Sequence, residues 1–247
     1  MCIRDSINKE NERGILLIYP MSFTEMGVRD LFINNMSGDY RYIVPELSGH
    51  GKSKEIFKSA QREADKIQSY LLDNKVEKID LAFGASLGGI VLLNLLKNKN
   101  LQIKKCIFEG SSLCQSGKLT EFLFRKVALN TYKRALKDRE FAIKELTKEY
   151  GEELSQLIVD CFINMSQESI KNIASDCAFV KLPNLSKEVQ ERCIFCYGSK
   201  EYFLKDARKI IKRKFPYATL KVWEGFNHCN KIIKDNLEYC KFLESQI

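Results

Sequence analysis

Histidine is scarce in this sequence, with two among 247 residues, and patterns that mark several large protein classes are missing. No apolar run approaches the roughly 20 residues that cross a bilayer, and no secretory apolar segment precedes the first expected strand. No cluster of side chains has metal-ligand spacing, and neither a Gly-x-Gly-x-x-Gly loop nor a phosphate-binding lysine loop occurs. We therefore expect no membrane partner, no metal and no cofactor.

The composition is that of an ordinary globular protein. Hydrophobic residues make up 45% of the chain and charged residues 29%, and this length suffices for one large α/β domain with a sizeable core. Lys and Arg outnumber Asp and Glu by 40 to 32, which gives a net charge of +8. These lysines are spread over expected helices without interleaved aromatic residues, for example Lys205, Lys209, Lys212 and Lys214. We therefore expect solvated helix faces and no nucleic-acid partner.

The nine cysteines follow no regular spacing. Several lie within apolar segments, where a thiol behaves as a small buried hydrophobe: Cys106, Cys161, Cys193 and Cys196. Cys193 and Cys196 match Cys-x-x-Cys, but residues three apart in a strand point to opposite faces, which disfavours a metal or redox pair. An odd number of free thiols predicts a reducing, cytoplasmic location.

Apolar strand patterns alternate with helical patterns along most of the chain. Strands are expected at 14–19, 41–44, 78–83, 104–108, 192–197 and 218–223, and helices at 25–35, 57–72, 87–97, 203–214 and 230–243. This alternation predicts an α/β fold with a mostly parallel central sheet and helices on both faces. Residues 1–6 read like a translated transposon-end sequence from a sequencing library, so we set them aside within an N-terminal segment 1–13.

A long segment, 114–190, interrupts this alternation and divides the core into 14–113 and 191–247. It is too long for a structureless loop, and amphipathic helical patterns occur at 119–136, 141–150, 154–165 and 170–178. Its larger apolar side chains line a pocket or simply hold these helices together, and both alternatives stay open: Phe122, Phe124, Leu157, Phe162 and Met165.

The most informative motif is Gly-Ala-Ser-Leu-Gly at 84–88, which directly follows an apolar strand pattern and precedes a helical one. A serine at the apex of such a tight strand-to-helix turn projects from the end of the sheet. The glycines fit because a Cβ at Gly84 or Gly88 would collide with neighbouring backbone. Ser86 is therefore a candidate nucleophile; the alternative is a glycine-rich turn with an incidental serine.

A base and an acid follow two later strands. His228 comes after the strand expected at 218–223, and Glu201 after that at 192–197. Glu109, after the strand expected at 104–108, is the alternative acid. The order serine, acid, histidine, with each residue after a strand, is one in which a serine–histidine–acid triad is known to occur.

Together with Pro45-Glu46-Leu47-Ser48-Gly49-His50-Gly51, these features resemble the α/β-hydrolase fold family. The resemblance runs from about residue 14 to the C-terminus, although 114–190 carries no motif. It implies that His50 organises its own loop, which leaves His228 as the candidate base. It also implies that the helical insertion forms a cap over the nucleophile, shaping the substrate pocket and limiting water access.

The resemblance further implies an oxyanion hole made by the backbone N–H groups of Leu87 and Met21. The sequence departs from the family just before Met21, because Pro20 stands where a glycine is usual and has no N–H to donate. Ser22 offers a hydroxyl as an additional donor or as a loop-closing hydrogen bond.

These residues predict a serine hydrolase that cleaves a small-molecule acyl substrate, an ester or thioester, through an acyl-enzyme on Ser86. A lyase or acyltransferase with the same triad, and a non-catalytic ligand-binding protein of the same fold, are the alternatives. Dehalogenase and epoxide-hydrolase chemistry is disfavoured because it needs a carboxylate in place of Ser86.

Overall fold

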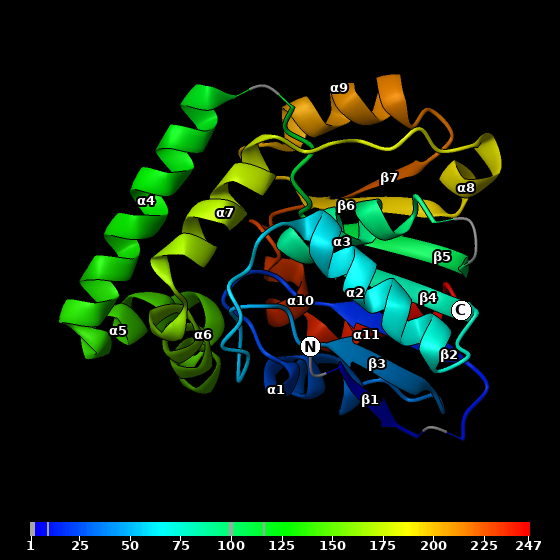
Figure 1. Cartoon of the computed structure of the whole chain (residues 1–247), viewed down its shortest axis with the longest axis horizontal. Helices are drawn as coiled ribbons and strands as arrows, with labels where there is room; N and C mark the ends of the chain where they lie inside the picture. The colour runs from blue at the N-terminus through cyan, green and yellow to red at the C-terminus, as the bar shows by residue number, and fades with distance from the viewer. Residues whose placement is uncertain (1–2, 9, 99–100, 116) are drawn as a thin grey trace.

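The computed structural model describes residues 3–8, 10–98, 101–115 and 117–247, and a seven-stranded sheet runs through its centre (Figure 1). The strand order is β1-β3-β2-β4-β5-β6-β7; β1 is antiparallel to β3, and all other neighbours are parallel. The strands are β1 Ile3–Ile7, β2 Gly14–Ile18, β3 Arg41–Pro45, β4 Lys78–Ala85, β5 Gln102–Glu109, β6 Cys193–Gly198 and β7 Thr219–Trp223. The predicted α/β fold with a mostly parallel sheet is confirmed.

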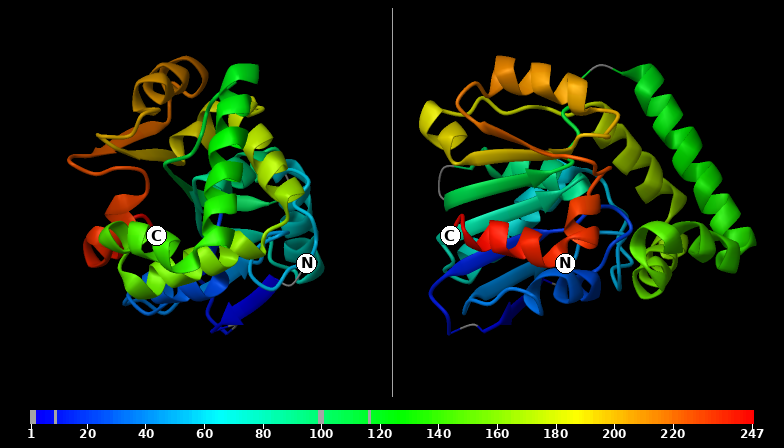
Figure 2. Two further views of the ribbon diagram at one scale, coloured as in Figure 1. Left: turned by 90° about the vertical axis from the view of Figure 1, so that its left-hand side faces the viewer. Right: turned by 180° about the vertical axis from the view of Figure 1, so that it is seen from behind.

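The central strands are buried on both faces, which explains why they read as continuous apolar runs. Every residue of β2 and β6 is buried, and only Lys78 of β4 is exposed. Helices α2 (Ala60–Asp73) and α3 (Leu87–Leu95) lie in front of the sheet in Figure 1, and α11 (Asn236–Glu244) lies in front of it when the molecule is seen from behind (Figure 2). All nine residues of α3 are buried.

Two expected helices are each divided. Residues 25–35 form a short α1 (Glu25–Val28) that continues as the π-helix η1 (Arg29–Ile33), and the C-terminal helix divides at Asp235 into α10 (Asn230–Lys234) and α11. The spacing of apolar residues alone does not reveal such changes in backbone hydrogen bonding. Helix α9 (Leu204–Lys214) agrees with expectation, and the five-residue α8 (Lys187–Glu191) was not predicted.

The long segment between β5 and β6 is helical, as expected. It contains α4 (Lys118–Lys137), α5 (Arg139–Tyr150), α6 (Glu152–Asn164) and α7 (Gln167–Ala178), which we call the helical insertion. Helix α4 lies farthest from the sheet, with α7 between it and the core (Figure 1). None of the helices in the described parts of the chain has the length and apolar character that a membrane crossing requires.

Strand β1 lies within the N-terminal segment that we set aside. It pairs with β3 through partners such as Ile3 with Pro45 and Arg4 with Val44. Pairing of this kind uses main-chain groups, which an open sheet edge offers to any extended segment. The non-native origin of residues 1–6 therefore stays a prediction.

Candidate active site

The turn from β4 into α3 holds Ser86 in a strained backbone conformation. Its φ of 49° and ψ of −111° lie in a region that non-glycine residues rarely occupy. The Ser86 N–H donates to the Glu109 carbonyl at 2.8 Å, which fixes the turn against the end of β5. A Cβ on Gly84 would lie 2.7 Å from the Gly88 carbonyl oxygen, and one on Gly88 would overlap the Ile18 carbonyl. This geometry favours a positioned nucleophile over an incidental serine.

The structure brings Ser86, His228 and Glu201 together in one chain of contacts. His228 Nε2 lies 3.1 Å from Ser86 Oγ, and His228 Nδ1 lies 2.9 Å from Glu201 Oε2. The other carboxylate oxygen of Glu201 accepts from the Gly198 N–H at 2.8 Å. In the neutral imidazole with its proton on Nδ1, the ring donates to Glu201 and accepts from the serine hydroxyl. The three residues predicted from the order of the chain are therefore arranged for proton transfer.

Contacts and burial act on the pKa of His228 in opposite directions. The adjacent Cys229 sulfur and the Glu201 carboxylate raise the pKa of His228 well above its usual value, and they outweigh burial, which lowers it. Burial raises the pKa of the Cys229 thiol, and the neighbouring His228 lowers it. Glu201, whose side chain is 3% exposed, contacts the ring at Nδ1.

Glu109, the alternative acid, lies close by but contacts different groups. One of its carboxyl oxygens accepts from Trp223 Nε1 at 3.0 Å and from the Tyr239 hydroxyl at 2.8 Å. Its other oxygen, Oε1, is buried and has no hydrogen-bond partner among the described residues. Burial raises the pKa of Glu109 to about 7. The structure thus places Glu201, and not Glu109, against His228.

Of the two predicted oxyanion donors, Leu87 follows the nucleophile in the chain, and Met21 lines the same cavity. Leu87 is the first residue of α3, where main-chain N–H groups and the helix dipole favour negative charge. Met21 lines the same cavity as Ser86, and the close approach of Gly88 to the Ile18 and Tyr19 carbonyls packs the two segments together. Ser22 also lines this cavity, and its hydroxyl lies 4.0 Å from the Met165 sulfur.

A cavity of about 520 Å³ lies between the helical insertion and the core, and we call it the catalytic cavity. Ser86 and His228 form part of its wall, and the insertion contributes mostly apolar side chains from α4, α5 and α6. Arg134 and Glu145 are the charged residues among its described lining. Phe141, Tyr150 and Ile158 also line it; the sequence carries no signal for them, because helical periodicity does not say which side of an insertion faces the core.

The five large apolar residues named in the insertion lie in different environments. Phe162 lines the catalytic cavity, whereas Leu157 lines another cavity of about 200 Å³. Phe124 packs its ring against Phe203 at 5.6 Å between centroids, and Met165 is buried with 1% exposure. Phe122 does not line any of the cavities described for this chain and is 60% exposed, on the outer side of α4.

His50 occupies the structural place expected of it. It is fully buried, and its Nδ1 lies 3.0 Å from the Ser48 carbonyl oxygen within the same loop. Burial lowers the pKa of His50 to about 4, so the ring is neutral at physiological pH. It is not part of the catalytic cavity lining.

No protein-family model and no curated protein matches the sequence. Among solved structures, it is similar over 99% of both chains to an α/β-hydrolase family protein from Desulfitobacterium hafniense, with a TM-score of 0.73 and 16% identity. A thermophilic esterase from Thermogutta terrifontis has a TM-score of 0.72 and 15% identity, covering 99% of this chain and 93% of that one. MenH from S. aureus has a TM-score of 0.70 and 18% identity, with 99% and 98% covered. The chain therefore has the α/β-hydrolase fold.

Proposed function

We propose that this protein is a serine hydrolase that cleaves a small acyl substrate, an ester or thioester, through an acyl-enzyme on Ser86. The observation that carries the proposal is the contact chain from Ser86 Oγ to His228 at 3.1 Å and on to Glu201 at 2.9 Å, at the wall of a large cavity. An incidental serine in a turn has no reason to meet both a histidine and a buried carboxylate.

The mechanism assigns each group one task. His228 takes the proton of the Ser86 hydroxyl as the oxygen attacks the substrate carbonyl carbon, and later returns it to the leaving group. Glu201 keeps the imidazole in the required tautomer and stabilises its transient positive charge. The N–H groups of Leu87 and Met21 receive the oxyanion. Water then attacks the acyl-enzyme with His228 again acting as base.

The helical insertion has the role of a cap in this proposal. It supplies most of the apolar wall opposite Ser86, so it excludes water from the acyl group and selects substrates by shape. Similarity to an esterase supports hydrolysis of esters, although the likeness is one of fold. Free thiols at each of the eight described cysteines support the cytoplasmic location expected from the sequence.

The proposal is tested by treating the protein with a fluorophosphonate and measuring its intact mass. The expected result is one adduct on the wild type and none on Ser86→Ala. Ser22→Ala is the matched control, since Ser22 lines the same cavity without a histidine partner, and it should still be labelled. Absence of an adduct on the folded wild type would contradict the proposal and favour a non-catalytic ligand-binding protein.

A further inference from the structure

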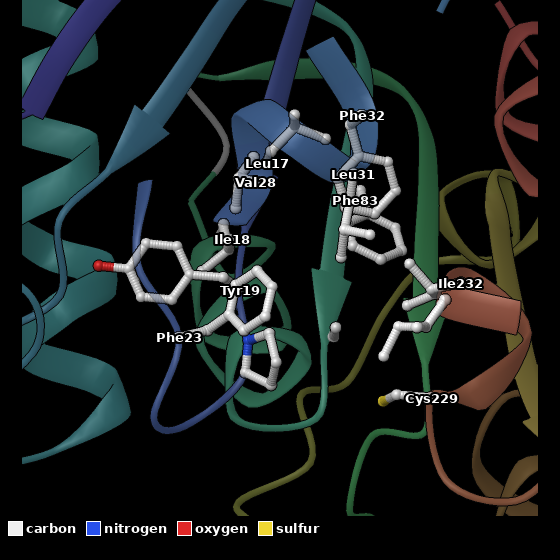
Figure 3. Close-up of a pocket in the computed structure, with 13 residues that line it drawn as sticks. Leu17, Ile18, Tyr19, Phe23, Val28, Leu31, Phe32, Phe83, Cys229 and Ile232 are labelled. Carbon is white, nitrogen blue, oxygen red and sulfur yellow. The ribbon is translucent and has the colours of Figure 1, made fainter. Parts of the chain in front are cut away.

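A third and smaller cavity, of about 40 Å³, lies beside the catalytic cavity and has no part in the mechanism above (Figure 3). We call it the inner chamber. Its walls come from β2 and β4 of the sheet, from α1 and η1, and from the segment that follows His228. The lining side chains are aliphatic or aromatic apart from the Cys229 thiol and the Tyr19 hydroxyl. That hydroxyl points away from the other labelled residues and accepts from the Leu47 N–H at 2.8 Å.

The lining of the inner chamber includes chain neighbours of the nucleophile, the base and one oxyanion donor. Ala85 directly precedes Ser86, Cys229 directly follows His228, and Pro20 directly precedes Met21. Four residues line both cavities, so the two cavities adjoin: Pro20, Phe23, Cys229 and Ile233. An acyl group attached to Ser86, with its carbonyl between Leu87 and Met21, therefore lies close to the place where the two cavities adjoin.

The two cavities differ in chemistry. The catalytic cavity includes Arg134 and Glu145, whereas no charged residue lines the inner chamber. A cavity with apolar walls does not hold water well and accepts apolar groups. Its volume corresponds to roughly three water-sized groups, which is the size of the end of an alkyl chain.

We propose that the inner chamber receives the end of the substrate's acyl chain, so that the protein prefers straight alkyl acyl groups to acetyl or branched ones. The inference rests on the proposed function, since the acyl group must first be attached to Ser86. Each additional methylene that enters the chamber raises kcat/KM about fourfold until the space is filled. The polar part of the substrate stays on the side of the catalytic cavity that carries Arg134 and Glu145.

The test measures kcat/KM for p-nitrophenyl esters of straight acyl chains from two to ten carbons. Ile232 lines only the inner chamber, and Ile158 lines only the catalytic cavity. Ile232→Ala enlarges the chamber and should move the preferred chain one or two carbons longer. Ile158→Ala makes the same truncation in the catalytic cavity and should leave the preferred acyl-chain length as in the wild type.

A filling variant gives the opposite shift. Leu31 is only half-buried and lines the chamber, so Leu31→Phe should shorten the preferred chain with little cost to folding. Circular dichroism and thermal melting identify the folded variants. A chain-length profile that is the same in the wild type and in folded Ile232→Ala and Leu31→Phe would overturn the inference, even with Ser86 labelled by the fluorophosphonate. No labelling and no hydrolysis of any ester would overturn the proposed function, and this inference with it.

Discussion

The sheet core and the helical insertion differ in how completely they bury their apolar side chains. All nine residues of α3 in the core are buried, whereas the twenty-residue α4 of the insertion buries only Tyr132 and Ala135 fully. Five apolar side chains of α4 are instead largely exposed: Leu119, Phe122, Leu123, Val127 and Leu136. Helix α4 therefore uses its packing surface mainly to line the catalytic cavity and to contact α7, and the core uses its surface to hold the reacting groups.

This difference indicates which substitutions should disturb the active site and which should not. A change at the carboxyl ends of the strands alters positions defined by close contacts, such as that of Gly88 with the Ile18 carbonyl. A change on the outer side of α4 alters a surface that contacts solvent. Under the proposed function, chemistry belongs to the core, and substrate choice is shared between the insertion and the inner chamber of the core.

The largest expected effect follows from removing the nucleophile or the base. Ser86→Ala and His228→Ala should each lower kcat by about 10⁴-fold or more, because neither acyl-enzyme formation nor proton transfer then occurs. The melting temperature should change little, since both side chains lie at the cavity wall. Ester hydrolysis and thermal melting of the purified variants check this; ester turnover by Ser86→Ala near the wild-type rate would exclude Ser86.

The next effect separates the two candidate acids, Glu201 and Glu109. Glu201→Gln should lower kcat by about 10² to 10⁴-fold, because the amide no longer supports the tautomer or the charge of His228. Glu109→Gln is the matched substitution and should have a much smaller effect, since Glu109 contacts Trp223 and Tyr239. Steady-state kinetics of both variants decide the matter. The reverse order of damage would show that our acid assignment is wrong.

Glu109 should instead control how stability depends on pH. Its folded-state pKa of about 7 lies above the usual value of 4.5, so the folded state holds this proton longer than the unfolded state does. The contribution of Glu109 to the free energy of unfolding is therefore greatest below about pH 4.5, and this contribution is lost as the pH rises through about 7. The contribution lost is about 3 kcal/mol.

Glu109→Gln removes this titration and should flatten the curve of unfolding free energy against pH between 5 and 8. Denaturant unfolding at several pH values measures it. Glu145→Gln, on the exposed wall of the catalytic cavity, is the control that should leave the slope unchanged. An unchanged slope in Glu109→Gln would show that Glu109 ionises normally in the folded protein.

The smallest effect is expected on the outer side of the insertion. Phe122→Ser should change the free energy of unfolding by no more than about 0.5 kcal/mol and leave kcat/KM unaltered, because the ring is 60% exposed. Phe162→Ala is its counterpart on the inner side and should raise KM, since Phe162 lines the catalytic cavity. Equal effects of the two substitutions would remove the distinction between the sides of the insertion.

The sheet was predictable because its strands are short apolar runs between helical patterns. The meeting of Ser86, Glu201 and His228 was predictable as well, since the carboxyl ends of parallel strands share one edge of the sheet. Orientation within the insertion was not predictable: Phe122 and Phe162 have the same kind of side chain in similar helical patterns, and only the packing of the helices separates them. The division at Asp235 and the π-helix after Val28 depend on local main-chain geometry that apolar spacing does not encode.

The reactivity of the buried cysteines reports when the sheet core or the helical insertion opens. Cys106 and Cys196 lie in adjacent strands of the core, and Cys161 lies in the insertion. Burial raises the pKa of Cys161 to about 11. A thiol reagent therefore meets these groups only when the surrounding structure opens, and the order in which they react measures how independently the insertion and the sheet unfold.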